Sequence, residues 1–275
     1  MHLVQHFLFL LLLSITLVQR CTTKALVNET SEEIDNNIDQ DYFSVSAIIE
    51  RANKNAGKEN RGFTILDGDI AVNTGLQNAD ECTYSKCKWH KSGNGKVYVP
   101  YVISRQFSCS EKKVIKDGLK SFEKLTCVRF IPREDEKDYI HIKSDEGCYS
   151  YVGRIGGEQV LSLDRNGCVF FKVIQHELLH ALGFHHEQSR SDRDKHVKIL
   201  YENIEPGMEN NFKKRKTNNL KTPYDYNSVM HYTRNAFSKN GKPTIKPIPR
   251  SNVSIGQAEK MSINDILRVK SLYCN

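Results

Sequence analysis

Two patterns of hydrophobic residues predict the elements of the chain after residue 95. The run KVYVPYVI at 96–103 follows a Gly-Asn-Gly turn and is rich in β-branched and aromatic residues, which predicts a strand. Pro100 within this run predicts an edge position or a bulge, because proline has no N–H to donate to a neighbouring strand.

Towards the C-terminus, segments with helical spacing of hydrophobic residues and segments with the alternation of a strand follow one another. Helical spacing of Ile115, Leu119 and Phe122 predicts a helix over 110–125, and Ser262 with Asp265 predicts the cap of a C-terminal helix. Short strands are expected at 127–131 and 139–143, where YIHIK alternates as a half-buried strand does. No internal repeat is visible, so we expect one mixed domain of helices and strands.

A single long apolar run lies near the N-terminus. Phe7 to Val18 form about a dozen apolar residues, shorter than the roughly 20 that span a bilayer, and no comparable run follows. We expect a cleaved secretory signal peptide over residues 1–20, with the cut anywhere from about Val18 to Ala25. An uncleaved anchor is the alternative.

Residues 1–77 differ in charge from the rest of the chain. They contain 6 basic and 10 acidic residues, a net charge of −4, and the remaining residues contain 34 and 23, a net charge of +11. An acidic leader before a basic body predicts a pro-segment over residues 21–77 that lies on a positively charged surface. A flexible acidic tail is the alternative.

Composition excludes several classes of protein. The 275 residues are 39% hydrophobic and 27% charged, which argues against collagen-like, low-complexity and coiled-coil chains. A mean hydropathy of −0.54 argues against a multi-span membrane protein. A basic adhesive or nucleic-acid-binding glycoprotein is disfavoured, because the basic residues are dispersed and show no aromatic interleaving.

The cysteines are expected to form disulfides, because the predicted signal peptide directs the chain to an oxidising compartment. Of eight cysteines, Cys21 lies beside the signal, and the other seven are expected to form disulfides after export. An odd number leaves one thiol without an intramolecular partner. Sequons at Asn28 and Asn252 fit a secreted glycoprotein.

The strongest chemical signal is the stretch VIQHELLHALGFHHE at 173–187, which contains HExxHxxGxxH. On a helix, His176 and His180 project from one face and can hold a single ion, while Glu177 reaches a bound water without ligating. Gly183 allows the chain to leave the helix sharply, so that His186 returns to the same ion. A buried helix with incidental histidines is the alternative.

Three neutral imidazoles leave one tetrahedral position open, as in a catalytic zinc site. Zinc lowers the pKa of bound water towards about 7 and polarises a carbonyl oxygen. Glu177 can take the proton of the attacking water and return it to the leaving amine. The motif therefore predicts metal-assisted peptide hydrolysis without a covalent intermediate.

The extended zinc motif, with His186-Glu187 and Ser228-Val-Met-His-Tyr232, resembles the astacins among the metzincins, from about residue 66 to Asn275. The resemblance implies a two-lobed α+β catalytic domain with a mixed twisted sheet, a long active-site helix and one zinc ion in the cleft between the lobes. It implies that Met230 forms the Met-turn beneath the histidines. It also implies that Tyr232 is an additional zinc ligand at rest that swings away to stabilise the oxyanion.

Within that family, Cys82 and Cys87 ahead of GNGKVYVPYVIS, and TPYDYNSVMHY further on, resemble the six-cysteine hatching enzymes of fish. This resemblance implies the disulfide pairs Cys82 with Cys87, Cys127 with Cys274, and Cys148 with Cys168. Cys109 is then left over, either as a buried thiol or with an intermolecular partner.

Leu66-Asp-Gly-Asp69 resembles the inhibitory FxGD motif of the family, with Leu in place of Phe. It implies that Asp69 binds the zinc of the zymogen. The resemblance also implies an activating cut between Gln77 and Asn78, which leaves a catalytic domain over 78–275 and lets the new amino group of Asn78 meet Glu187.

These inferences predict a secreted zinc endopeptidase made as a zymogen. The fish branch implies egg-envelope glycoproteins as substrates, and the alternatives are a digestive or defence protease of adult tissue, or a non-catalytic secreted binding protein on the same fold. We expect protein substrates and an activating protease as partners, no nucleic acid, no membrane anchor, and a monomer.

Overall fold

A mixed sheet of seven strands organises the described chain. The structure, a computed structural model, describes residues 41–56, 62–73 and 87–275. The sheet order is β1-β2-β6-β7-β5-β3-β4, with both parallel and antiparallel neighbours. Its strands are β1 (Phe63–Leu66), β2 (Ile70–Asn73), β3 (Val97–Ile103), β4 (Val128–Pro132), β5 (Tyr139–Lys143), β6 (Cys148–Ser150) and β7 (Glu158–Leu163).

The strand with Pro100 is not at the edge of the sheet, so the expectation of an edge position is wrong. β3 lies between β4 and β5 in the sheet. Its pairing with β4 covers Val97 to Tyr101, whereas its pairing with β5 begins only at Tyr101. Pro100 therefore falls where β3 has a partner on one side only, and the missing N–H costs no ladder hydrogen bond there.

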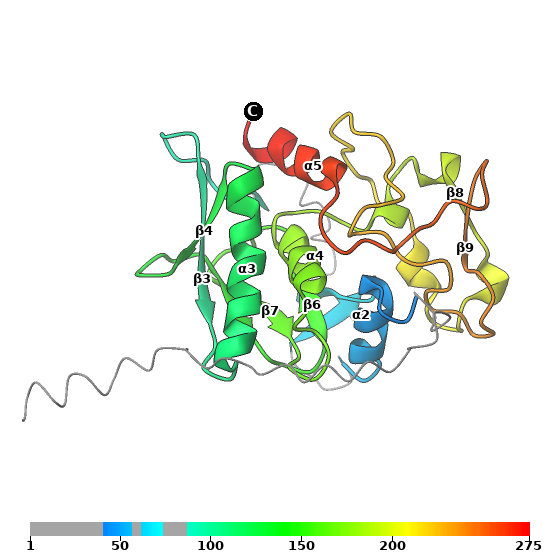
Figure 1. The fold of residues 1–275 in the computed structure, drawn as a ribbon, viewed down its shortest axis with the longest axis horizontal. Helices are drawn as coiled ribbons and strands as arrows, with labels where there is room; N and C mark the ends of the chain where they lie inside the picture. The colour runs from blue at the N-terminus through cyan, green and yellow to red at the C-terminus, as the bar shows by residue number, and fades with distance from the viewer. Residues whose placement is uncertain (1–40, 57–61, 74–86) are drawn as a thin grey trace, which may run out of the picture. The chain divides into compact units, whose positions relative to one another are not determined.

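Two helices on the sheet form at the predicted places. Helix α3 (Cys109–Leu125) begins with a capping box, in which Ser108 and Glu111 satisfy each other's backbone N–H groups, and it buries Ile115, Leu119 and Phe122. Helix α4 (Phe171–Ala181) packs against α3, β6 and β7, and the two helices lie side by side in Figure 1. Since Lys172 to Ala181 are all buried, α4 is enclosed on every side.

Two separate hydrophobic clusters form the core of the residues that the structure describes. The larger joins the sheet, α3, α4 and the C-terminal helix α5 (Ile263–Tyr273), which begins at the predicted Ser262–Asp265 capping box. The smaller cluster comes from residues 197–255, a stretch with few regular elements, and includes Tyr232. The regular parts of this stretch are β8 (Val197–Ile199), β9 (Ile245–Pro247) and the 3-10 turns η4 (Tyr201–Asn203) and η5 (Glu209–Phe212). Two further 3-10 turns, η2 (Glu187–Ser189) and η3 (Arg193–Lys195), lie between α4 and this stretch.

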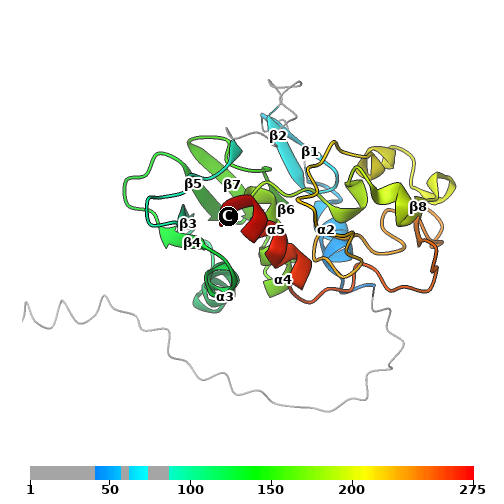
Figure 2. The same ribbon diagram turned by 90° about the horizontal axis from the view of Figure 1, so that it is seen from above.

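The acidic leader contains more structure than its polar sequence predicts. The apolar patch FSVSAII contributes to helix α2 (Val45–Asn53), which buries Val45, Ile48 and Ile49 against the larger cluster. Strands β1 and β2 form a hairpin that adds to the sheet beside β6 (Figure 2). The Asn53 side chain links α2 to the hairpin and to β6, because its amide donates to the carbonyls of Gly68 and Cys148 at 2.7 Å.

The described disulfides include two of the implied pairs. Cys127 is bonded to Cys274 and Cys148 to Cys168. Cys109 is also disulfide-bonded, so the expectation of a leftover thiol there is wrong. That expectation came from assigning the other six cysteines after residue 77 to the three implied pairs. Cys82 lies outside the described residues, so its pairing with Cys87 stays a prediction.

The α+β fold with a mixed sheet is confirmed. In the part of the chain that the structure describes, no helix has the length and apolar character needed to cross a bilayer. The expected signal peptide and the 77–78 boundary fall outside the described residues and stay predictions.

Candidate active site

Helix α4 and the turn after it place three histidines together. His176 and His180 lie one turn apart, and their side chains are at most 2% exposed. The helix ends at Ala181, and Gly183 follows with a φ of 100°, a conformation that residues with a Cβ rarely adopt. Its N–H donates to the His180 carbonyl at 2.7 Å, and the chain then turns back to His186.

The three imidazoles converge through the same ring nitrogen. His176 Nε2 lies 3.1 Å from His180 Nε2 and 3.3 Å from His186 Nε2. His176 Nδ1 lies 2.9 Å from the Val229 carbonyl, and His180 Nδ1 lies 2.7 Å from the Phe184 carbonyl. Because a carbonyl only accepts, Nδ1 carries the proton in both rings and Nε2 presents a lone pair.

Asp69 completes the group from the opposite direction. It lies in the short loop Asp67-Gly68-Asp69 that joins β1 to β2, where Leu66 pairs with Ile70. Its Oδ2 lies 3.0 Å from His176 Nε2 and 3.2 Å from His186 Nε2. One atom from each of the four residues falls within 4.8 Å of the others, and all four residues are buried.

This donor set fits a zinc ion. Burial raises the pKa of Asp69, but His186, His180 and His176 outweigh it and hold that pKa well below its usual range. Burial lowers the pKa of His180 to about 4, so its ring is neutral at pH 7. Three imidazole nitrogens and a carboxylate oxygen that meet at one buried point are ligands that zinc accepts. Tetrahedral ligands about 2.0 to 2.1 Å from zinc lie about 3.4 Å apart, close to the separations observed.

Glu177 lies beside this group and is fully buried. Among the described residues, neither of its carboxylate oxygens has a hydrogen-bond partner. Burial, and then the charge of Asp69, raise its pKa well above the usual range. An unpartnered buried carboxyl is costly and suits a group that receives a proton during a reaction.

Tyr232 contacts both the histidines and the hairpin. Its ring centroid lies 4.7 Å from that of His186, and its hydroxyl donates to the Asp67 carbonyl. Gly68 has a φ of 89°, and a Cβ built there would lie 2.9 Å from the Tyr232 hydroxyl oxygen. The close approach of the hairpin therefore requires glycine at this position.

The turn with Met230 supports the histidines through its backbone. The Met230 carbonyl accepts from the Glu187 N–H at 2.9 Å, and Met230 is 2% exposed in the larger cluster. Asp265 on α5 accepts from Ser228 Oγ at 2.7 Å and from Val229 N at 3.0 Å. The C-terminal helix thus holds the segment whose Val229 carbonyl orients His176.

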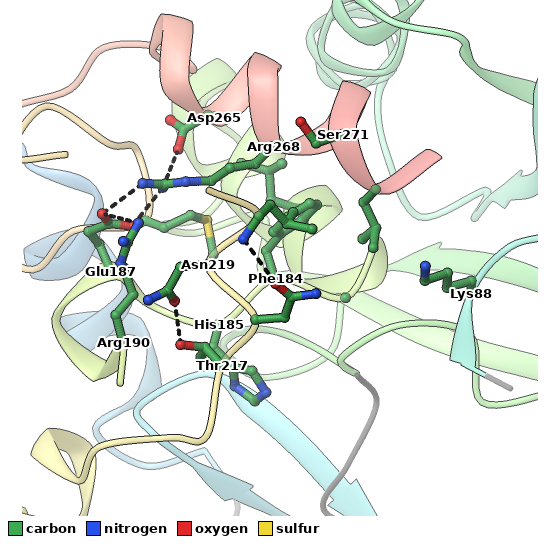
Figure 3. A pocket seen from close by; sticks show the side chains of 16 residues that line it. Lys88, Phe184, His185, Glu187, Arg190, Thr217, Asn219, Asp265, Arg268 and Ser271 are labelled. Atoms are coloured by element: carbon green, nitrogen blue, oxygen red, sulfur yellow. Dashed lines mark hydrogen bonds and ion pairs between the residues drawn. The ribbon is translucent and has the colours of Figure 1, made fainter. Parts of the chain in front are cut away.

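Glu187, next to His186, is enclosed by positive charge. Arg268 on α5 approaches its two carboxylate oxygens at 2.6 and 2.8 Å, and Arg190 lies 3.4 Å away. Both arginines converge on Glu187 in Figure 3, at a cavity of about 320 Å³ also lined by Gly183 and Met230. Burial raises the pKa of Glu187 to about 7, although Arg268 and Arg190 oppose this shift.

The structure brings together all the predicted site residues that it describes, and Asn78 lies outside the described residues. Sequence reasoning missed the roles of Arg268, Asp265 and the Asp67–Arg215 ion pair. Asp265 was visible only as a helix cap. Nothing local in the sequence marks the two arginines, because their partners lie 81 and 148 positions away.

Residues 82–274 match the family model described as Astacin, a family of peptidases. Low choriolytic enzyme of Oryzias latipes is 47% identical over 269 residues, 97% of this chain and 96% of that protein. High choriolytic enzyme 1 of the same fish is 47% identical over 234 residues, 85% of this chain and 84% of that protein.

A solved structure of high choriolytic enzyme 1, described as a hatching enzyme zinc-protease of the medaka fish Oryzias latipes, also matches. It has a TM-score of 0.69 and 52% sequence identity, and the match covers 72% of this chain and 100% of that one. With a family match over well more than half of its length, the protein belongs to the astacin family of zinc metallopeptidases.

Proposed function

We propose that the protein is a secreted zinc endopeptidase, made as a zymogen whose pro-segment blocks the metal site through Asp69. His176, His180 and His186 are the metal ligands in this proposal. The observation that carries it is the Asp69 carboxylate at 3.0 to 3.4 Å from the three converging Nε2 atoms. An ionised side chain in that position occupies the place that a reacting water needs.

Catalysis follows from the groups around the histidines. A zinc ion held there polarises the substrate carbonyl and lowers the pKa of water. Glu177, buried and without a hydrogen-bond partner among the described residues, takes the proton of the attacking water and passes it to the leaving amine. The Tyr232 hydroxyl donates to the substrate carbonyl oxygen as negative charge develops on it.

Activation requires removal of the hairpin. In this proposal the leader comprises a signal peptide over 1–20 and a pro-segment over 21–77, and a partner protease cuts between Gln77 and Asn78. The new amino group of Asn78 then reaches Glu187. The cavity beside Glu187 supports this step, because it offers about 320 Å³ next to a buried carboxylate.

The substrate that we propose is the glycoprotein coat of a fish egg. The support is the 47% identity to the low and high choriolytic enzymes, which extends over 97% and 85% of this chain. Purified processed enzyme should solubilise isolated fish egg envelopes faster than it digests casein. Good casein digestion with intact envelopes would favour the digestive or defence alternative.

Latency is tested by expressing the full precursor with Asp69→Ala. The uncleaved variant should hydrolyse a fluorogenic peptide, while the uncleaved wild type stays silent. Asp69→Ala combined with Glu177→Gln is the matched control and should be silent, which rules out a contaminating protease. If Asp69→Ala stays silent until it is processed, the Asp69 block is wrong.

A further inference from the structure

Two consecutive hydrogen bonds connect Tyr224, in the smaller cluster, to the backbone of Tyr232. The Tyr224 hydroxyl oxygen lies 2.8 Å from His231 Nε2, and His231 Nδ1 lies 2.7 Å from the Tyr232 carbonyl oxygen. Because a carbonyl only accepts, Nδ1 carries the proton. Burial raises the pKa of Tyr224 well above its usual range, so its hydroxyl keeps its proton and donates it to Nε2.

Building on the function proposed above, we propose that Tyr224 is a positioning residue for catalysis. Through His231 it fixes the backbone of Tyr232. Only the Tyr232 side chain then rotates when its hydroxyl moves from the pro-segment to the carbonyl of the substrate.

The backbone of Tyr232 is held on both sides of its side chain. Its N–H donates to Gln188 Oε1 at 3.3 Å, and its carbonyl accepts from His231. Gln188 is anchored in turn, because its own carbonyl accepts from Arg193 Nη1 at 2.9 Å. Gln188 and His231 are at most 2% exposed, and neither belongs to the pro-segment. These bonds therefore remain after the pro-segment has left.

The bond from His231 gains importance on activation. The Tyr232 carbonyl and the Thr233 N–H belong to the same planar peptide group. In the uncleaved chain this group is held from both ends, because the Thr233 N–H donates to Ser46 Oγ of α2 at 3.0 Å. Ser46 leaves with the pro-segment, so the bond from His231 remains to hold the peptide group.

The Tyr224 ring is itself fixed by the enzyme body. It stacks on the His196 ring, with the centroids 4.7 Å apart and an interplanar angle of 10°. The guanidinium carbon of Arg190 lies 5.6 Å from the centroid of the Tyr224 ring. Tyr224 is only 7% exposed, so its hydroxyl is presented to His231 in a fixed direction.

The test compares processed wild type with Tyr224→Phe, Tyr232→Phe and the double variant on a fluorogenic peptide. Tyr224→Phe removes one buried hydrogen bond, so kcat should fall by about three- to tenfold while KM stays unchanged. Tyr232→Phe lacks the hydroxyl that needs positioning. Adding Tyr224→Phe to that variant should therefore leave its residual kcat unchanged.

Tyr226→Phe is the matched control for loss of a hydroxyl in the same aromatic group. The Tyr226 hydroxyl donates to the His196 and Ile248 carbonyls at 3.0 and 3.1 Å and not to His231. The kcat of Tyr226→Phe should match wild type.

A merely structural role of Tyr224 would lower kcat by the same factor with and without the Tyr232 hydroxyl, and that result would overturn the inference. A wild-type kcat in Tyr224→Phe would overturn it too. If Tyr224→Phe does not fold, His231→Phe, which keeps a ring but removes both nitrogens, takes its place in the same comparison. A wild-type kcat in Tyr232→Phe would instead contradict the proposed role of Tyr232 in catalysis.

Discussion

The three histidines and Asp69 meet at one point, but they are built into the molecule in different ways. The histidines come from one short stretch, and two of them lie on a helix that is enclosed on every side. Asp69 lies 107 positions before His176, in a hairpin whose pairing with the sheet consists of Ile70 opposite Ser150. The histidines can move only if the core opens, whereas few backbone bonds hold the hairpin.

The contrast separates a permanent part of the site from a removable part. The permanent part has supports of its own, because the Val229 and Phe184 carbonyls orient His176 and His180. At its tip the hairpin contacts Tyr232, Arg215 and the histidines. Substitutions in the permanent part should therefore change the processed enzyme, and those in the tip should change the precursor.

The largest effect is expected from Glu177→Gln in the permanent part. The kcat of the processed variant should fall by roughly 10²- to 10⁴-fold, because the carboxylate that moves the proton has been replaced by an amide. Its zinc content, measured by atomic absorption, should match wild type. Activity within a few-fold of wild type would show that another group carries the proton.

A smaller effect is expected from Asp265→Asn, which weakens the support of the histidines without touching them. Asp265 holds Ser228 and Val229, and the Val229 carbonyl orients His176. Zinc affinity in a competition titration with a chelator should fall by about 10- to 100-fold, as for other groups that orient metal ligands. Lys270→Ala, at an exposed position of α5, is the control and should leave the affinity unchanged.

The smallest effect is expected from Gly68→Ala in the tip. The new Cβ would lie 2.9 Å from the Tyr232 hydroxyl oxygen, at a φ of 89°. This strain should raise the residual activity of the uncleaved precursor by about tenfold. Gly62→Ala is a matched control, because Gly62 has a φ of 75° but no atom within 4 Å of the built Cβ. If the uncleaved Gly68→Ala and Gly62→Ala precursors had equal residual activity, the increase would come from backbone strain alone and not from the contact with Tyr232.

The same contrast explains how much of the site could be predicted from the sequence. The spacing of the three histidines is local: helical geometry was enough to place His176 beside His180, and the glycine at 183 indicated the turn that brings His186 to them. Helix α3 was predictable from the helical spacing of Ile115, Leu119 and Phe122, and helix α5 from the cap that Ser262 and Asp265 form, because both signals are local in the sequence. Asp69 was accessible only through a resemblance, since no local rule links it to a residue 107 positions away.

The elements that were missed depend on tertiary contacts. The polar leader gave no strand signal, yet β1 and β2 form because the edge of β6 offers a partner and the tip finds Tyr232 and Arg215. From the sequence alone, Arg268 would be expected on the surface of a C-terminal helix. Only the tertiary structure shows that it contacts Glu187. In each of these cases the structure depends on a contact between residues that lie far apart along the chain, which the sequence does not indicate.

The most direct test of the central claim is a crystal structure of the uncleaved precursor purified with zinc. The account predicts one zinc ion bound by Nε2 of His176, His180 and His186 and by a carboxylate oxygen of Asp69, at about 2.0 to 2.2 Å. A water molecule in the fourth position, with the Asp69 carboxylate beyond bonding distance, would contradict it.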